Sequence, residues 1–247
     1  MTTALQDKVA LVTGGSRGIG AAIAVRLAAD GADVAFTYRG SHDRASDVVE
    51  RIKATGRRAV ALAADSADPV AVRDAVERAA GDLGRLDVLV NNAAVFAVKP
   101  LEETGVDEFE EAMAVNVRAV FVATQAAVPH MAAGGRIISI GSNVADRAVF
   151  PGLTMYATSK AALVGLTKAL GRELGPRAIT VNLVVPGPTD TDTNPADGPA
   201  AATINGFTAL GRFAAPAEVA GVVAYLARPE AAYITGATVP VDGGFTI

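Results

Sequence analysis

Short runs of β-branched and apolar residues alternate with helical segments along the whole chain, and this alternation limits the fold more than any other feature. Runs such as Val9–Val12 and Val88–Val90 are apolar without a period of two, which is typical of parallel strands covered on both faces. The predicted strands are Lys8–Thr13, Asp33–Tyr38, Arg58–Ala63, Asp87–Asn91, Arg136–Ile140, Ala178–Val184 and Thr238–Val241. The pattern predicts a seven-stranded, mainly parallel, doubly wound α/β sheet in the order 3-2-1-4-5-6-7, with helices on both faces.

Turn and cap residues punctuate the predicted helices. Asp68 and the proline that follows it begin a helix that runs to Leu83, and Pro216 opens another that runs to Ala227. Glycines stand where three helices should end, at Gly31, Gly56 and Gly84. No low-complexity linker divides the chain, so we predict a single domain over residues 1–247. Residues 185–206 are rich in Pro, Gly, Thr and Asp and are predicted to form a flexible loop over the substrate.

Composition and charge exclude several classes of protein. The chain has no cysteine, so it has no disulfide, no thiolate nucleophile and no zinc site built on cysteine, and we expect a reducing cytoplasmic location. A formal net charge of −4 without a basic cluster argues against a nucleic-acid partner. Charges interrupt the apolar runs, so no membrane association is expected. Neither His42 nor His130 has a second ligand at metal spacing, and both are predicted to lie on the surface.

A glycine-rich turn follows the first predicted strand directly. Gly14, Gly18 and Gly20 lie in the segment Thr13-Gly-Gly-Ser-Arg-Gly-Ile-Gly20, where the next helix begins. Glycine lets the backbone approach an anion closely, and the N–H groups and dipole of the helix start favour a phosphate. The spacing is not the G-x-G-x-x-G fingerprint, and an ordinary strand-to-helix turn that needs glycine for steric reasons remains the alternative at this point.

The ordered set of motifs resembles the short-chain dehydrogenase/reductase family over essentially the whole chain. The motifs, in chain order, are Thr13-Gly14 with Gly18-Ile19-Gly20, Asn91-Asn92-Ala93-Ala94, Asn116, Ser142, Tyr156-(x)3-Lys160 and Pro186-Gly187. Two positions depart from the usual pattern of the family. Ala94 replaces a glycine, and Thr189 stands where the family's Pro-Gly-x-(Ile/Val)-x-Thr segment commonly has Ile or Val. The resemblance implies a Rossmann-type fold and a homotetramer, for which the apolar segments Val115–Val128 and Ala161–Leu170 would provide contact faces.

The resemblance also implies the roles of individual residues. By motif match, Asn116, Ser142, Tyr156 and Lys160 are catalytic: serine orients a carbonyl, tyrosine donates a proton, lysine holds the nicotinamide ribose, and asparagine anchors a water relay. The residues implied to bind the cofactor are Gly14, Ser16, Arg17, Gly18, Ile19, Gly20, Tyr38, Arg39, Asp65, Ser66, Asn92, Ala93, Pro186, Gly187, Thr189 and Thr191. No metal is implied.

The residue types support these roles independently. Tyr156 and Lys160 lie one helical turn apart, and a nearby cation stabilises the phenolate of a tyrosine. Taken alone, a Tyr-(x)3-Lys pair is more often a surface pair, or a tyrosine packed by its ring beside a lysine that reaches the solvent. Ser142 lies just after a strand, at the edge of the sheet where ligands of open α/β folds bind. Ser139 is the competing serine, but it lies within an apolar strand and is interpreted as a sheet residue.

The end of the second predicted strand bears on the choice of cofactor. Sites specific for NAD place an acidic residue there, and this sequence has Tyr38. Arg39 and Arg17 could pair with a 2′-phosphate, so NADP(H) is favoured. The alternatives are a solvated surface role for both arginines and an approach of Asp43 to the ribose. Asp65 matches an aspartate that contacts adenine in the family, and it could instead cap the following helix.

Two functions remain open from the sequence. The favoured one is NADP(H)-dependent reduction of a ketone or 3-oxoacyl group to a secondary alcohol. Apolar residues expected to line the site imply a hydrophobic carbonyl substrate: Val95, Phe96, Val144, Phe150, Leu153 and Phe207. The other function is a regulatory protein that binds a cyclic dinucleotide, because some similar proteins with this function share the loop sequence Asp190–Pro195. Asp190 and Asp192 within this loop are interpreted as turn and cap formers.

Overall fold

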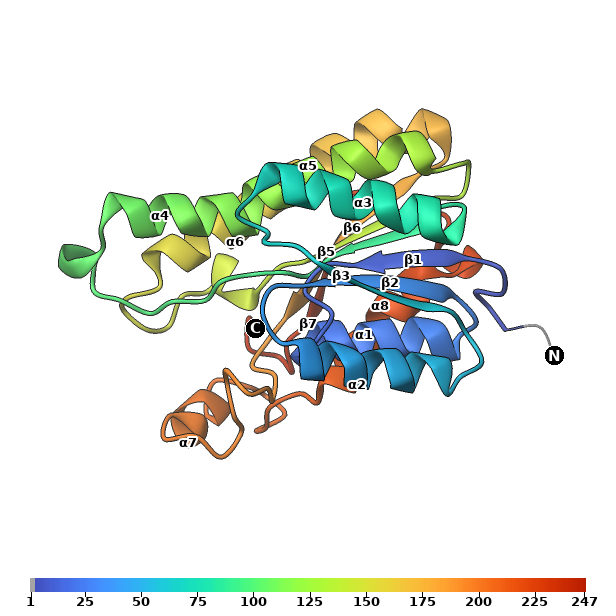
Figure 1. Cartoon of the computed structure of the whole chain (residues 1–247). Helices are drawn as coiled ribbons and strands as arrows, with labels where there is room; N and C mark the ends of the chain where they lie inside the picture. The colour runs from blue at the N-terminus through green and yellow to red at the C-terminus, as the bar shows by residue number, and fades with distance from the viewer. Residues whose placement is uncertain (1–2) are drawn as a thin grey trace.

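Seven parallel strands form one sheet in a computed structural model that describes residues 3–247 (Figure 1). The strand order is β3-β2-β1-β4-β5-β6-β7, and every neighbouring pair is parallel. The strands are β1 Val9–Val12, β2 Asp33–Tyr38, β3 Ala59–Ala63, β4 Val88–Asn91, β5 Arg136–Ile140, β6 Thr180–Pro186 and β7 Thr238–Val241. The predicted order and the doubly wound topology are confirmed.

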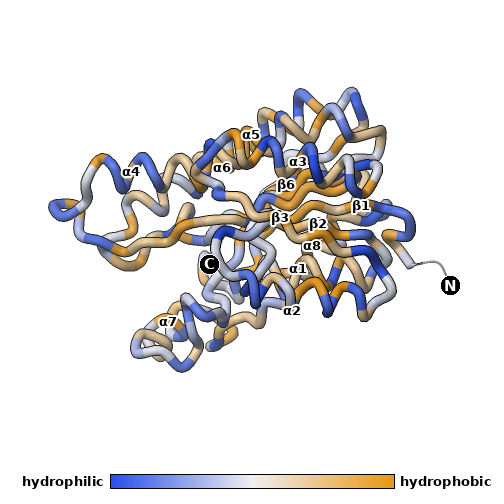
Figure 2. The backbone as a smooth tube through the Cα atoms, viewed as in Figure 1, coloured by the Kyte–Doolittle hydropathy of each residue, from blue (hydrophilic) through white to orange (hydrophobic). Residues whose placement is uncertain are grey.

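Helices cover both faces of the sheet (Figure 1). One face carries α1 (Gly18–Ala29), α2 (His42–Lys53) and α8 (Pro216–Ala227). The opposite face carries α3 (Pro69–Leu83), α5 (Ala119–Ala127) and α6 (Thr154–Leu174), and α4 (Val106–Met113) extends beyond the sheet on the same side. The short helix α7 (Ala201–Asn205) lies outside both layers, in the orange segment at the lower left. Hydrophobic residues concentrate in the strands and the inner faces of the helices, because the sheet is covered on both sides (Figure 2).

Local sequence signals set the ends of these helices as predicted. The Asp68 carboxylate accepts a hydrogen bond from the Val70 N–H at 2.8 Å, which caps α3. Gly84 then ends α3 in the left-handed conformation, with φ of 88°. Gly31 and Gly56 likewise have positive φ after α1 and α2. Pro216 is the first residue of α8. Gly31, Gly56 and Gly84 each end a helix shortly before β2, β3 or β4 begins. Because all neighbouring strands are parallel, their carboxyl ends lie at one edge of the sheet.

One continuous helical stretch, Val106–His130, is long and apolar enough to cross a membrane by length and composition alone. It contains α4, a π-helical turn at Ala114–Arg118, α5 and a final 3-10 turn. More than half of its apolar window is buried inside the fold, at 56%. The apolar side chains of its α5 segment pack with α3 and the sheet, which accounts for their hydropathy.

The segment predicted as a flexible loop contains ordered elements. Val185 and Pro186 belong to β6 and are buried, and Ala201–Asn205 forms α7. Between them, Thr189 pairs with Ala214, and Thr191 pairs with Asn194 in a tight turn. Beyond the end of β6, the segment therefore consists of hydrogen-bonded turns and one short helix. We keep the name substrate loop for residues 185–206.

Candidate active site

The glycine-rich turn joins β1 to α1 in a conformation that only glycine fits. Gly14 and Gly18 have φ of 66° and 52°. A Cβ at Gly20 would lie 2.3 Å from the Gly14 carbonyl oxygen and 2.5 Å from Asn92 Nδ2. Arg17, at the N-cap of α1, makes no side-chain capping bond, so the first N–H groups of the helix lack a side-chain acceptor. The turn therefore offers a close-fitting cradle of N–H donors to an anion.

Three polar side chains hold this turn in place. Asn92 Nδ2 donates to the carbonyl oxygens of Thr13 and Gly14, at 3.0 and 3.1 Å. Thr13 Oγ1 accepts from the N–H groups of Asn92 and Ala93, and Thr37 Oγ1 accepts from the Gly14 N–H. The Asn92 side chain, which was expected to bind cofactor, is thus occupied in fixing the turn. Thr37 is a supporting residue that the sequence analysis missed.

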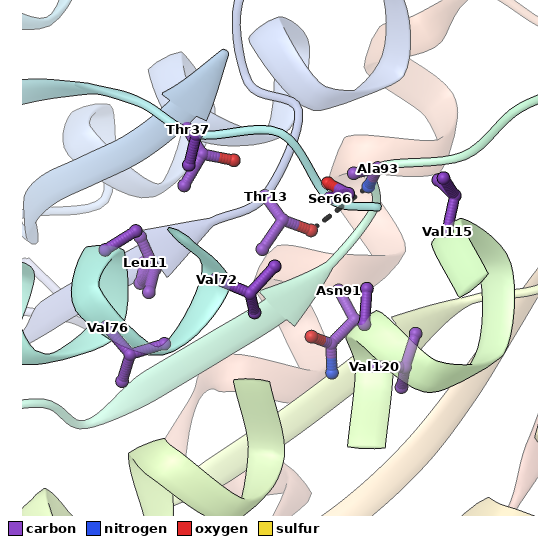
Figure 3. A pocket seen from close by; sticks show the side chains of 13 residues that line it. Leu11, Thr13, Thr37, Ser66, Val72, Val76, Asn91, Ala93, Val115 and Val120 are labelled. Atoms are coloured by element: carbon purple, nitrogen blue, oxygen red, sulfur yellow. Dashed lines mark hydrogen bonds between the residues drawn. The ribbon is translucent and has the colours of Figure 1, made fainter. Parts of the chain in front are cut away.

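A cavity lies beneath the turn, between α3, α5 and the carboxyl ends of β1 and β4 (Figure 3). Thr13, Ser66, Asn91 and Ala93 line it together with apolar side chains, and Figure 3 marks the bond from the Ala93 N–H to Thr13. Asn91 is buried, and its Nδ2 donates to Ser139 Oγ at 3.4 Å. Ser139 is therefore a buried sheet residue, as predicted.

Tyr156 and Lys160 share one face of α6, and their side chains meet. Lys160 Nζ lies 5.6 Å from the centre of the Tyr156 ring and donates to the Ile140 carbonyl oxygen at 2.8 Å. Lys160 is only 3% exposed, and this burial lowers the pKa of its ammonium group to about 8. The ammonium is therefore still mostly charged at pH 7, and a buried cation beside a phenol can stabilise the phenolate.

Ser142 follows β5 and faces the same phenol. Burial raises the pKa of Tyr156, and the neighbouring Ser142 hydroxyl partly offsets this rise. The other contacts of the hydroxyl are long, at 3.4 Å from the Val144 N–H and 3.5 Å to Asn143 Oδ1. Phe96 packs edge-on against the Tyr156 ring, with 4.8 Å between ring centres. The arrangement can present a proton donor to a carbonyl oxygen beside an aromatic wall.

Asn116 lies in the π-helical turn Ala114–Arg118, whereas the sequence predicted an ordinary helix. Its Nδ2 donates to the Val95 carbonyl oxygen at 3.0 Å and to Ser159 Oγ at 2.9 Å, and its Oδ1 accepts from the Val95 N–H. The extra residue of a π-turn widens the helix locally, and such turns are frequent at functional sites. Asn116 thus joins the π-helical turn to the segment at Val95 and to α6. Ser159 is a second supporting residue that the sequence analysis did not identify.

The expected phosphate-binding arginines are exposed at the other end of the site. Within residues 3–247, neither Arg17 nor Arg39 forms an ion pair. Tyr38 ends β2, and its hydroxyl lies 2.8 Å from His42 Nδ1. Asp65 is exposed and accepts from the Ala67 N–H at 2.9 Å, so its carboxylate stabilises the turn before α3.

Pro186 ends β6, and the expected cofactor residues Gly187, Thr189 and Thr191 follow it. A Cβ at Gly187 would lie 2.7 Å from Asp242 Cα, so the C-terminal segment packs directly on this turn. The Thr189 hydroxyl donates to the Gly187 carbonyl oxygen at 3.0 Å. A Cβ at Gly18 would lie 3.3 Å from the Thr191 methyl group. The substrate loop therefore packs against the glycine-rich turn. Asp190 forms a turn through the Ala196 N–H as predicted, whereas Asp192 instead pairs with Arg44.

Comparison with known proteins identifies the family. A family model described as enoyl-(acyl carrier protein) reductase matches residues 14–246. A short-chain dehydrogenase from Burkholderia cenocepacia J2315, solved in complex with NADP, is 55% identical, with a TM-score of 0.98 over 99% of this chain and 100% of that one. The chain belongs to the short-chain dehydrogenase/reductase family. A member of this family from Serratia marcescens BCRC 10948 is 54% identical, with a TM-score of 0.97 over 99% of this chain and 100% of that one.

One similar curated protein carries a different description. The cyclic-di-GMP-binding biofilm dispersal mediator protein of Escherichia coli K12 is 44% identical over 242 residues, which is 98% of each chain. Family membership makes this chain an oxidoreductase by class. The relatives therefore support a reductase scaffold and also show that a protein this similar has been described as a nucleotide-binding regulator.

Proposed function

We propose that this short-chain dehydrogenase/reductase reduces a hydrophobic ketone or 3-oxoacyl group to a secondary alcohol with NADPH. The observation that carries the proposal is the buried Lys160 ammonium beside the Tyr156 phenol, with the Ser142 hydroxyl close enough to that phenol to lower its pKa. A regulatory site for a nucleotide has no need of a charged lysine held in the protein interior, because burying such a charge costs folding free energy. Proton transfer from Tyr156 to a carbonyl oxygen does need such a cation, because the ammonium stabilises the phenolate that is left.

The chain's residues fit a dinucleotide cofactor. The cradle formed by Gly14, Gly18 and Gly20 leaves no room for a Cβ at Gly20 and presents the start of α1 to a pyrophosphate. Arg17 and Arg39 are exposed and have no carboxylate partner within the described chain, so they can hold a 2′-phosphate. NADP bound to the Burkholderia relative agrees with this assignment. When bound, the cofactor supplies hydride to the carbonyl carbon.

The side chains divide the remaining work. Ser142 donates to the carbonyl oxygen and orients it, and Tyr156 gives that oxygen its proton. The Lys160 ammonium lowers the cost of the phenolate that remains on Tyr156. Asn116 holds the segment at Val95 through two hydrogen bonds, and a third bond, to Ser159, ties this segment to α6. The apolar wall at Phe96 favours a substrate with a hydrophobic or aromatic body.

The direct experiment is oxidation of NADPH, followed by absorbance, with a panel of aliphatic, aromatic and 3-oxoacyl carbonyl compounds. We expect turnover with apolar ketones and none with the corresponding alcohols under reducing conditions. Failure of every carbonyl compound, together with intact NADPH binding, would contradict the reductase proposal.

Cyclic-dinucleotide binding is the second candidate, favoured by the description of the Escherichia coli relative. Titration calorimetry with cyclic di-GMP, in the presence and absence of NADPH, tests it. Binding at a site where NADPH does not compete, without carbonyl turnover, would favour the regulatory function over the reductase.

We also propose that the protein is a cytoplasmic homotetramer. Phe121 on α5 and Tyr225 on α8 are 48% and 46% exposed, and they lie on helices that cover opposite faces of the sheet. Two separate aromatic surfaces suit an assembly with two kinds of contact. Light scattering at micromolar concentration tests the assembly, and a monomer there would contradict it.

A further inference from the structure

The substrate loop is joined to the cofactor half of the domain by one long-range ion pair. Arg44 Nη1 lies 2.5 Å from Asp192 Oδ2, although 148 positions separate the two residues. Arg44 is in the first turn of α2, shortly after Tyr38 ends β2, and Asp192 is inside the tight turn between Thr191 and Asn194. The pair therefore connects the phosphate end of the site to the loop that follows β6.

A second contact lies beside this ion pair. The Thr191 methyl group packs over Gly18, so the same turn touches both the glycine-rich turn and α2. The turn itself is held by bonds of its own: Thr191 and Asn194 exchange backbone hydrogen bonds, and Asp190 accepts from the Ala196 N–H. An internally bonded turn moves as a unit, so an interaction at Asp192 controls where the whole turn sits.

Exposure determines how strong the pair can be. The side chains of Arg44 and Asp192 are 49% and 56% exposed. Solvent screening limits such a pair to a small stabilisation, corresponding to at most about a fivefold change in an equilibrium or a rate. A weak and reversible contact holds the loop closed without trapping it.

We propose that Arg44 and Asp192 form a latch that closes the substrate loop over the bound dinucleotide and slows its dissociation. The inference rests on the proposed function, because it assumes that the dinucleotide lies along the glycine-rich turn. Both residues are positioning residues: they act through the loop, and neither touches the reacting atoms. The latch holds NADPH and NADH equally, because it bridges two protein segments and does not read the 2′-phosphate.

The test compares the dissociation of NADPH and of NADH by stopped-flow displacement, followed by nicotinamide fluorescence. The variants are Arg44→Gln, Asp192→Asn and the charge-swapped double variant Arg44→Asp/Asp192→Arg. Lys53→Gln is the matched control, because Lys53 forms an exposed ion pair with Glu50 on the same helix, away from the loop. We expect each single variant to release both cofactors about two- to fivefold faster and the control to match wild type. The charge swap should restore a rate near that of wild type.

A second readout does not depend on the cofactor. Hydrogen exchange of residues 189–196 in the cofactor-free protein should be faster in both single variants and restored in the charge swap. The single-turnover rate of carbonyl reduction should stay unchanged in all variants, as expected of positioning residues.

Several results would overturn the latch. If Asp192→Asn released both cofactors at the wild-type rate, the latch proposal would be wrong. It would also be wrong if the charge-swapped variant released them as fast as the single variants do. Faster release of NADPH alone in Arg44→Gln would place Arg44 on the 2′-phosphate instead. If wild-type protein bound neither dinucleotide, the proposed function itself would fail, and that result is distinct from normal binding with unchanged release.

Discussion

The two ends of the candidate site are built in different ways. At the chemical end, Lys160 and Asn116 are 3% and 1% exposed, and each has hydrogen-bond partners from distant segments. At the phosphate end, Arg17 and Arg39 are exposed, and the described chain offers them no carboxylate. Hydrogen bonds hold the side chains of the chemical end in a fixed geometry, whereas the two arginine side chains of the phosphate end have no ion-pair partner in the described chain. Catalysis needs fixed geometry, while recognition of a charged group tolerates mobile side chains.

The largest expected effect is at the chemical end. Tyr156→Phe should lower kcat by about 100- to 10,000-fold while NADPH affinity stays close to wild type, because only the proton donor is lost and the ring still packs against Phe96. Steady-state kinetics and a fluorescence titration of NADPH measure the two quantities. Tyr225→Phe, at an exposed position on α8, is the control. More than about a tenth of wild-type kcat in Tyr156→Phe would show that the phenol is not the main acid.

Next in size is a change at the phosphate end. Tyr38→Asp combined with Arg39→Ala should reduce the NADPH to NADH ratio of kcat/KM by about 10- to 100-fold, because it removes an attractive charge and adds a repulsive one. Most of the change should come from weaker NADPH binding. The exposed Arg51 on α2 provides the control variant Arg51→Ala. A wild-type enzyme that already prefers NADH would contradict the assignment and direct attention to Asp43.

The buried lysine predicts a cost in stability. Its pKa of about 8 in the folded protein is below its ordinary value of 10.5, so the unfolded chain binds more protons between these pH values. The contribution of Lys160 to the free energy of unfolding should therefore rise with pH from about 8 to about 10.5 and stay constant below about 8. Lys160→Met should raise the free energy of unfolding at pH 7 by about 1–3 kcal/mol and remove that rise, while activity is lost.

Urea denaturation at pH 7 and at pH 10 measures this effect, and Lys168→Met on the exposed side of the same helix is the control. A Lys160→Met variant that is less stable than wild type at pH 7 would mean that the bond to the Ile140 carbonyl outweighs the cost of burying the charge.

The smallest expected effect is a difference between the two ends of the site in their response to ionic strength. Raising the ionic strength from ~0.05 M to ~0.5 M should reduce the preference for NADPH over NADH by about two- to threefold, because exposed charge pairs are screened. The rate of the chemical step, measured by single turnover at saturating cofactor, should change less, because Lys160 is buried. A chemical step as sensitive to salt as cofactor preference would contradict the contrast between the two ends.

The sequence by itself determined the sheet, its strand order and the position of the glycine-rich turn. These features depend on local signals: β-branched runs, the Asp68 cap, and glycine where φ must be positive. The Tyr156 and Lys160 pair was also visible, because four residues on a helix always bring two side chains to one face. Periodicity and spacing are enough to predict a feature wherever residues close together in the chain determine its structure.

Only the tertiary structure decided how the site works. The burial that lowers the pKa of Lys160, the bonds from Asn116 to Val95 and Ser159, and the hold of Asn92 on the glycine-rich turn all join residues far apart in the chain. The pairing of Arg44 with Asp192 spans 148 positions and left no pattern in the sequence. Contacts of this kind follow from which elements the completed sheet brings side by side, so no local pattern could have revealed them.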